Sequence, residues 1–127
     1  MIRRTQEQAQ AFDALAEKEI LAVLARHGVK HSDFRTSDRN RKVRYATFER
    51  GDGEFEIVIC ENITMTHGKQ LFECYLNREF TNDDALIGGF TRRLDRFLSG
   101  GPWREPDEEE PGPIARALRR VVAALRR

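Results

Sequence analysis

Cysteine is scarce in this chain of 127 residues, which contains only two. Two cysteines are too few for the framework of a disulfide-rich secreted domain. No apolar run approaches the roughly 20 residues that a transmembrane helix needs, and no apolar run of a signal peptide follows the first residues. We therefore expect a soluble cytoplasmic protein, long enough to fold around an ordinary hydrophobic core.

The chain also lacks an excess of charge, because 22 basic and 21 acidic residues leave a formal net charge of +1. This balance argues against a dedicated nucleic-acid-binding protein, although a neutral total can hide one basic face. Eighteen of the basic residues are arginine. Arginine pairs well with phosphate and carboxylate groups, but a GC-rich genome produces the same bias and is the favoured explanation.

Clusters of catalytic or metal-binding residues are missing as well. His27, His31 and His67 are scattered, whereas a structural zinc site needs four ligands. A nucleophilic pair of Cys60 or Cys74 with His67 is the weaker interpretation, since strand cysteines usually act as small core residues. We predict no catalytic residue, no metal site and no cofactor, which favours a non-catalytic protein over an enzyme without deciding between them.

Residues 54–77 form the stretch around which the rest is organised. Two apolar, β-branched and aromatic runs flank His67-Gly68, which is the pattern of two paired strands joined by a tight turn. Since side chains alternate along a strand, each run places its apolar residues on one face: Phe55, Ile57 and Ile59, then Phe72, Cys74 and Leu76.

A shared core face sets the expected register of this pair. With His67-Gly68 as the turn, Ile63 lies opposite Phe72, and Ile59 lies opposite Leu76. A slip by one residue would divide the apolar residues between the two faces. Cys60 and Cys74 are therefore expected on opposite faces and not disulfide-bonded.

Two helices are predicted, one on each side of the strands. The first covers about Gln6–His27, with Thr5 and Gln8 at capping-box spacing and Gly28 after its end. Its apolar arc, on which Glu19 intrudes, contains Phe12, Leu15, Ala16, Ile20, Val23 and Leu24. Glu19 is read as an edge residue that reaches water.

The second helix begins near Thr81–Asp84 and ends at Gly100-Gly101-Pro102. Gly88-Gly89 indicates either that the helix begins after them or that a backbone or ligand approaches closely. Its apolar arc contains Leu86, Ile87, Phe90, Leu94, Phe97 and Leu98, and its basic edge contains Arg92, Arg93 and Arg96.

Between the first helix and the strands, residues 29–41 are polar and irregular. Basic residues gather here, and we interpret the segment as a solvated connector rather than a phosphate-binding loop. The basic residues are Arg35, Arg39, Arg41, Lys42 and Arg44. A strand at about Val43–Arg50 follows, and the turn Gly51-Asp52-Gly53 joins it to the next.

Composition divides the chain into a globular domain at 1–103, a Pro/Gly linker at 104–113 and a terminal helix at 114–127. The linker contains five acids within 105–110, and the terminal segment contains five arginines and no acid. This amphipathic basic helix is suited to an apolar groove, an anionic surface or a nucleic-acid backbone. The predicted partner-binding residues are Arg92, Arg93, Arg96, Ile114, Arg116, Leu118, Arg119, Arg120, Val121, Leu125, Arg126 and Arg127, with Val122 on the same apolar arc.

The order helix, three strands, helix resembles the core of the restriction-endonuclease-like nucleases. That family holds Mg²⁺ with an acid on the second strand and an acid-x-lysine motif on the third. Asp52, Glu54 and Glu56 lie near the second strand here, but the third offers Glu73-Cys74-Tyr75, without the lysine. The resemblance therefore implies at most a degenerate nuclease.

The same order resembles two binding families. Double-stranded-RNA-binding domains open their last helix with lysines, whereas this chain has Asn82-Asp83-Asp84 there. Small α+β chaperones of bacterial secretion systems bind an extended partner and dimerise. Both resemblances concern the order of helices and strands along the chain and not specific residues.

We predict an α+β fold in which a three-stranded antiparallel meander has both long helices on one face. The expected function is a small non-catalytic accessory, regulatory or inhibitor-like protein of bacterial or phage type, which acts by protein–protein interaction. The alternatives are nucleic-acid binding through arginine-rich faces, a secretion-type chaperone and the degenerate nuclease. Self-association through the terminal helix fits the same pattern, and a membrane is not an expected partner.

Overall fold

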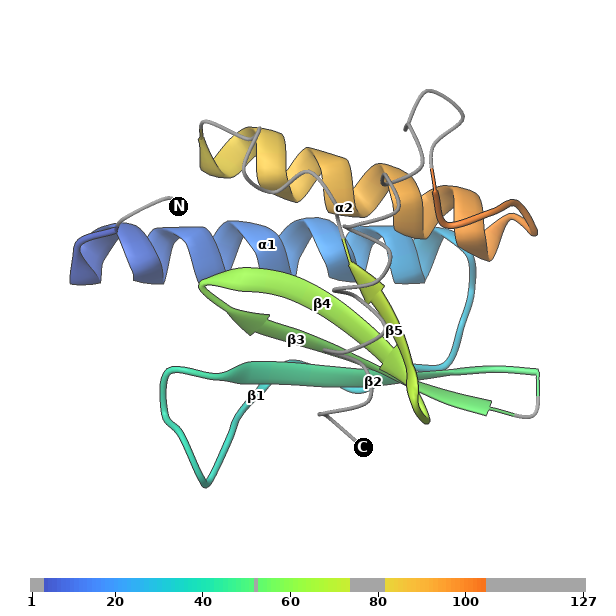
Figure 1. Cartoon of the computed structure of the whole chain (residues 1–127), viewed down its shortest axis with the longest axis horizontal. Coiled ribbons are helices and arrows are strands. Elements are labelled where there is room, and N and C mark those ends of the chain that lie inside the picture. Colours follow the sequence, from blue (N-terminus) through green and yellow to red (C-terminus); the bar gives the residue numbers. More distant parts are fainter. Residues whose placement is uncertain (1–3, 52, 74–81, 105–127) are drawn as a thin grey trace, which may run out of the picture.

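The computed structural model describes residues 4–51, 53–73 and 82–104. A five-stranded antiparallel sheet carries two helices on one of its faces (Figure 1). The strands follow one another in the sheet in chain order. The elements are α1 (Gln6–Arg26), β1 (Arg35–Thr36), β2 (Arg44–Arg50), β3 (Gly53–Cys60), β4 (Asn62–His67), β5 (Gln70–Glu73) and α2 (Asp83–Leu98). The predicted α+β class is confirmed, but the predicted three strands are wrong, because the meander has five.

Helix α1 begins with the predicted capping box. The Thr5 hydroxyl accepts from the backbone N–H of Gln8 at 3.1 Å, and the Gln8 side chain accepts from the backbone N–H of Thr5 at 2.9 Å. Gly28 follows the helix with φ +65°, the left-handed conformation expected of a glycine there. Glu19 is exposed, so it is the edge residue that was expected. The buried side of α1 consists of Phe12, Ala16, Ile20, Val23 and Leu24.

Helix α2 starts at Asp83, and its cap is Asn82, whose side chain accepts from the backbone N–H of Ala85 at 2.8 Å. The predicted capping residue Thr81 lies outside the described residues. The helix runs through Gly88 and Gly89, so it does not begin after them. Its buried residues include Leu86, Ile87, Phe90 and Leu94 of the predicted arc, whereas Phe97 and Leu98 are half-buried.

The unexpected hairpin lies between β3 and β4. Cys60 pairs with Asn62 across the single residue Glu61, which adopts φ +61°. A glycine or asparagine usually takes this left-handed conformation, so the sequence has no ordinary turn signal here. Consequently Ile59 pairs with Ile63, not with Leu76 as predicted, and Leu76 lies outside the described residues.

The register of β4 and β5 is also shifted from the expected one. The turn is Gly68-Lys69, because His67 pairs with Gln70 and Met65, not Ile63, pairs with Phe72. The shift is by two residues, and a shift by two leaves every side chain on its original face. The predicted core face is therefore correct for Phe55, Ile57, Ile59 and Phe72, all of which are buried.

The connector at 29–41 contributes more to the fold than expected. It includes β1 and an isolated bridge from His31 to Phe48, and Phe34 is buried in the core. Ser32 of this connector donates from its backbone N–H to the Thr47 carbonyl, and its hydroxyl accepts from the Thr47 N–H. It is an ordered edge of the sheet rather than only a solvated link.

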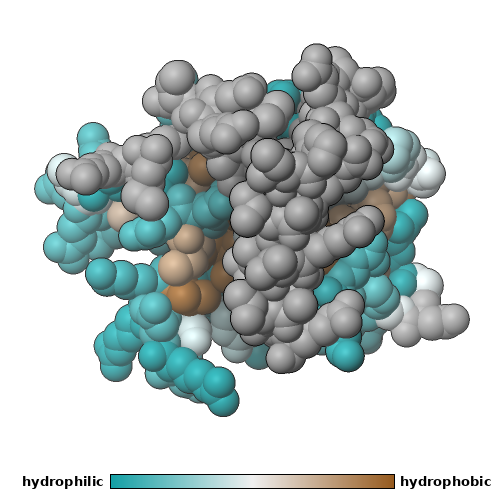
Figure 2. Space-filling view, viewed as in Figure 1, coloured by the Kyte–Doolittle hydropathy of each residue, from teal (hydrophilic) through white to brown (hydrophobic). Residues whose placement is uncertain are grey.

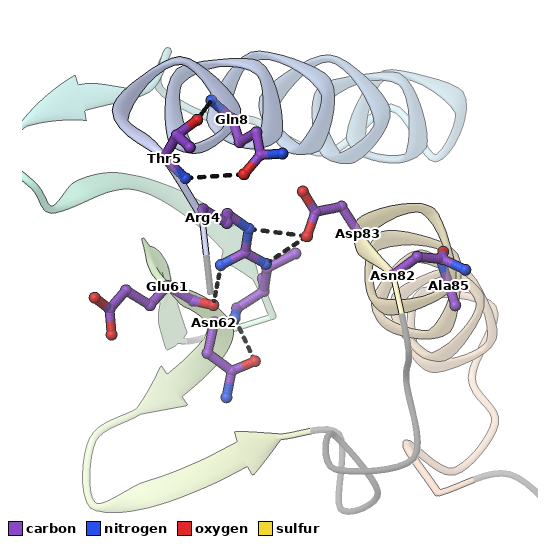
Figure 3. Close-up of polar contacts among 9 residues, drawn as sticks. Arg4, Thr5, Gln8, Glu61, Asn62, Asn82, Asp83 and Ala85 are labelled. Carbon is purple, nitrogen blue, oxygen red and sulfur yellow. Dashed lines mark hydrogen bonds and ion pairs between the residues drawn. The ribbon is translucent and has the colours of Figure 1, made fainter. Parts of the chain in front are cut away.

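Arg4 joins three elements just ahead of α1 (Figure 3). Its Nε donates to Asp83 Oδ1 at 2.8 Å, at the start of α2, and its Nη1 donates to the carbonyl of Glu61 at 2.9 Å. The guanidinium carbon also lies 3.8 Å from the centroid of the Phe12 ring. The Arg4 side chain is only 6% exposed. One arginine therefore fixes the start of both helices to the β3–β4 turn. No sequence pattern predicted this role of Arg4.

Candidate binding site

The face of the sheet away from the helices carries a patch that we call the open face. Its side chains alternate with the core residues, and cross-strand pairing sets them in rows. Most are half-exposed, and Leu71, at 36% exposure, is the exposed large apolar residue of the described chain. The two longest rows are Arg35–Tyr45–Val58–Thr64–Glu73 and Thr47–Glu56–Thr66–Leu71.

One corner of the open face is acidic. Glu49 and Glu54 lie directly opposite each other on β2 and β3, and Glu56 lies two residues along β3 on the same face. All three are exposed, and the described cation within 4 Å of one of them is Lys30, whose Nζ lies 3.8 Å from Glu49. Like charges opposite each other destabilise a sheet. The arrangement is costly for folding and suits a basic ligand.

The predicted basic edge of α2 does not form a single surface. Arg92 is exposed, and Arg96 is half-buried with its Nη1 donating to the carbonyl of Arg104 at 3.1 Å. Arg93 is only 3% exposed, and its Nη1 donates to the carbonyl of Gly89 at 2.7 Å. A helical wheel missed this because it does not show which neighbours cover a side chain. The remaining predicted partner-binding residues, within 114–127, lie outside the described residues.

The basic connector is split between structure and surface. Arg44 forms a bidentate ion pair with Glu17, with its Nη2 2.6 Å from Oε1 and its Nε 3.2 Å from Oε2. This pair raises the pKa of Arg44, chiefly through the hydrogen bond to Glu17. Burial, and then the neighbouring Glu17, raise the pKa of Asp13. Exposed basic residues remain at Arg35, Arg39, Arg41 and Lys42.

The histidines are held apart by separate contacts. His27 Nε2 lies 2.7 Å from Asp95 Oδ1, and hydrogen bonding to His27 lowers the pKa of Asp95. His31 Nδ1 donates to the carbonyl of Ser32 at 2.8 Å. Within residues 4–51, 53–73 and 82–104, no three His, Cys, Asp or Glu side chains converge as metal ligands would. Cys60 is a half-exposed free thiol, and Cys74 lies outside the described residues.

The surface in Figure 2 is largely hydrophilic over the described residues, with apolar side chains visible in a few small areas. Neither α1 nor α2 is long and apolar enough to cross a bilayer. In comparisons with known proteins, no protein family, no curated protein and no solved structure matches the chain.

Proposed function

We propose that this chain is a non-catalytic binding protein that acts by protein–protein interaction, and that the open face receives a basic amphipathic segment of its partner. The observation that supports the proposal is the acidic corner beside half-exposed apolar side chains. Tyr45, Val58 and Leu71 offer apolar area, while Glu54 and Glu56 add exposed negative charge beside Glu49.

The charges favour a basic partner segment over a nucleic acid at this face. A phosphate backbone would be repelled by the glutamates, whereas arginines on an amphipathic helix would pair with them. Placing Glu49 opposite Glu54 costs folding free energy through repulsion of like charges. A cation of the partner that bridges the two carboxylates in the complex would explain why the protein carries this cost. The chain itself contains a segment of this chemistry, 114–127, which makes a ready probe and links the proposal to self-association.

The experiment is a titration of a labelled peptide with the sequence of residues 114–127, followed by fluorescence anisotropy. The full chain is compared with the variant E54Q/E56Q. Exposed ion pairs contribute about 0.2–1 kcal/mol each, so we expect the double substitution to raise Kd roughly 2- to 30-fold. Added salt should weaken binding to the unmodified chain more than to the variant.

The matched control is E19Q/E61Q, which removes the same charge from exposed side chains off the open face. It should leave Kd unchanged. Equal losses in the two variants would show that net charge alone attracts the peptide, and the open face would then not be the binding site. Tighter binding of a DNA duplex than of the peptide would instead favour the nucleic-acid alternative, with Arg35, Arg39 and Arg41 as its contacts.

Deletion of 114–127 tests the role expected of the terminal segment. We expect the shortened chain to stay folded and to lose most partner affinity or self-association. Circular dichroism melts and light scattering measure the two properties separately. An unfolded product would mean that the segment is structural and would refute its assigned role in binding.

A further inference from the structure

A hollow opens on the helix-covered side of the sheet, at the end where the core residues stop. Along this face, the row of Phe48 and Phe55 is followed by Arg50 and Gly53, which pair with each other at the end of the β2–β3 hairpin. The hollow has a volume of about 490 Å³ and is lined by Arg50, Gly51, Gly53, Phe55 and His67. We call it the Arg50–His67 notch.

Arg50 is held in place by an aromatic ring instead of an ion pair. Its guanidinium carbon lies 4.4 Å from the centroid of the Phe97 ring of α2. Among the described residues, no carboxylate lies within 4 Å of its nitrogens. A guanidinium stacked on an aromatic ring keeps its N–H groups available at the edge, in the fork that matches an oxyanion.

His67 is fixed by three neighbours. Its ring stacks on Phe55 with centroids 4.3 Å apart, and Nδ1 donates to the carbonyl of Glu54 at 3.1 Å. The ring also fills the space beside Gly53, where a β-carbon would lie only 2.0 Å from Cε1. Because Nδ1 is engaged, Nε2 is the nitrogen left for a ligand. It accepts a hydrogen bond when the ring is neutral and donates one when the ring is charged.

We propose that the Arg50–His67 notch binds a small molecule through an oxyanion group, either phosphate or carboxylate. Arg50 supplies two N–H donors to the anion. His67 Nε2 either donates a hydrogen bond to a second oxygen of the anion or accepts one from its hydroxyl group. The volume admits a ligand larger than the anion alone, and the apolar contribution of Phe55 suits its uncharged part. This site is on the opposite side of the sheet from the open face, so it stands independently of the proposed protein interaction.

The test uses the full chain with inorganic phosphate and, separately, acetate as probes, at constant ionic strength set with chloride. NMR follows the imidazole Cε1–H signal of His67 during each titration. We expect a saturable shift with at least one probe, and the stronger response identifies the anion class. The variant R50Q should weaken binding at least tenfold. R50K, which keeps the charge but loses the fork, should weaken it by an intermediate factor.

The matched control is R41Q, which removes an exposed arginine of the connector and should leave both titrations unchanged. Circular dichroism confirms that each variant is folded before its titration is interpreted. A His67 signal that does not respond to either anion would overturn the proposal. Unaltered binding in R50Q, or an equal loss in R41Q, would overturn it as well.

Discussion

Replacing Gly53 with alanine is the sharpest test of how the end of the sheet is packed. Gly53 needs no unusual backbone angle, since it is absent from the residues with positive φ. The three nearest atoms that a β-carbon at Gly53 would meet all belong to the His67 ring, with Cε1 only 2.0 Å away. The substitution therefore tests one contact, and removing the His67 ring should remove the obstacle.

The expected energies follow from opposing terms. Overpacking costs about 1–3 kcal/mol, while alanine in place of a strand glycine recovers about 0.5–1 kcal/mol. G53A alone should thus destabilise the fold by roughly 0–2.5 kcal/mol. H67A alone loses the stack on Phe55, about 0.5–1.5 kcal/mol, and the hydrogen bond to the Glu54 carbonyl, about 0.5–1.5 kcal/mol.

In the double variant G53A/H67A, the alanine has no ring to displace, so it should stabilise the chain relative to H67A alone. Urea denaturation of the four proteins yields the coupling energy, provided that the slope m stays constant. We expect a coupling of about 1–3 kcal/mol. If the losses of G53A and H67A sum to the loss of the double variant within roughly 0.5 kcal/mol, the packing of His67 over Gly53 is refuted.

Three further perturbations address the rest of the fold. R4A removes the buried partner of a partly buried ion pair, in which the Asp83 side chain is 28% exposed, and should cost about 1.5–3 kcal/mol in a denaturant titration. A loss below about 1 kcal/mol would contradict its joining role. F90A should cost about 3–5 kcal/mol, and F97A clearly less, because Phe97 is half-buried; equal losses would contradict this difference. Asp95 has a lowered pKa from its bond to His27, so its contribution is present above the usual value of 3.8 and is lost as pH falls further. D95N should therefore destabilise the chain slightly at pH 6, by under about 1 kcal/mol, because the Asp95 side chain is 46% exposed. A deficit that persists at pH 2 would rule out this charge effect.

The faces of the strands could be predicted because alternation survives a register error of two residues. Phe55 and Phe72 were placed on the core face correctly, although Phe72 pairs with Met65 and not with the predicted Ile63. The β3–β4 hairpin could not be predicted, because Glu61 adopts a conformation that its residue type does not signal. Arg4, which lies 57 residues away in the chain, helps to hold Glu61 there because its Nη1 donates a hydrogen bond to the Glu61 carbonyl. Contacts at such separation leave no local pattern.

The candidate surfaces were predictable to different degrees. Glu54 and Glu56 alternate with the apolar residues of β3, so their exposure on a common face could have been read from the sequence. Their pairing with Glu49 depends on the β2–β3 register, and the pairing of Arg50 with Gly53 depends on it too. The burial of Arg93 required the packing of whole elements and was beyond a helical wheel.

The junction at Arg4 has a consequence for the rates of folding and unfolding. Arg4 and Asp83 are separated by 79 positions in the chain, whereas each strand of the meander pairs with its neighbour in sequence. A contact that closes a long loop costs conformational entropy before it contributes any stabilising energy, so such contacts form late in folding. Loss of this junction should therefore accelerate unfolding and leave the folding rate nearly unchanged. In that case Arg4 governs the lifetime of the native state, and the local strand pairs govern how quickly it is reached.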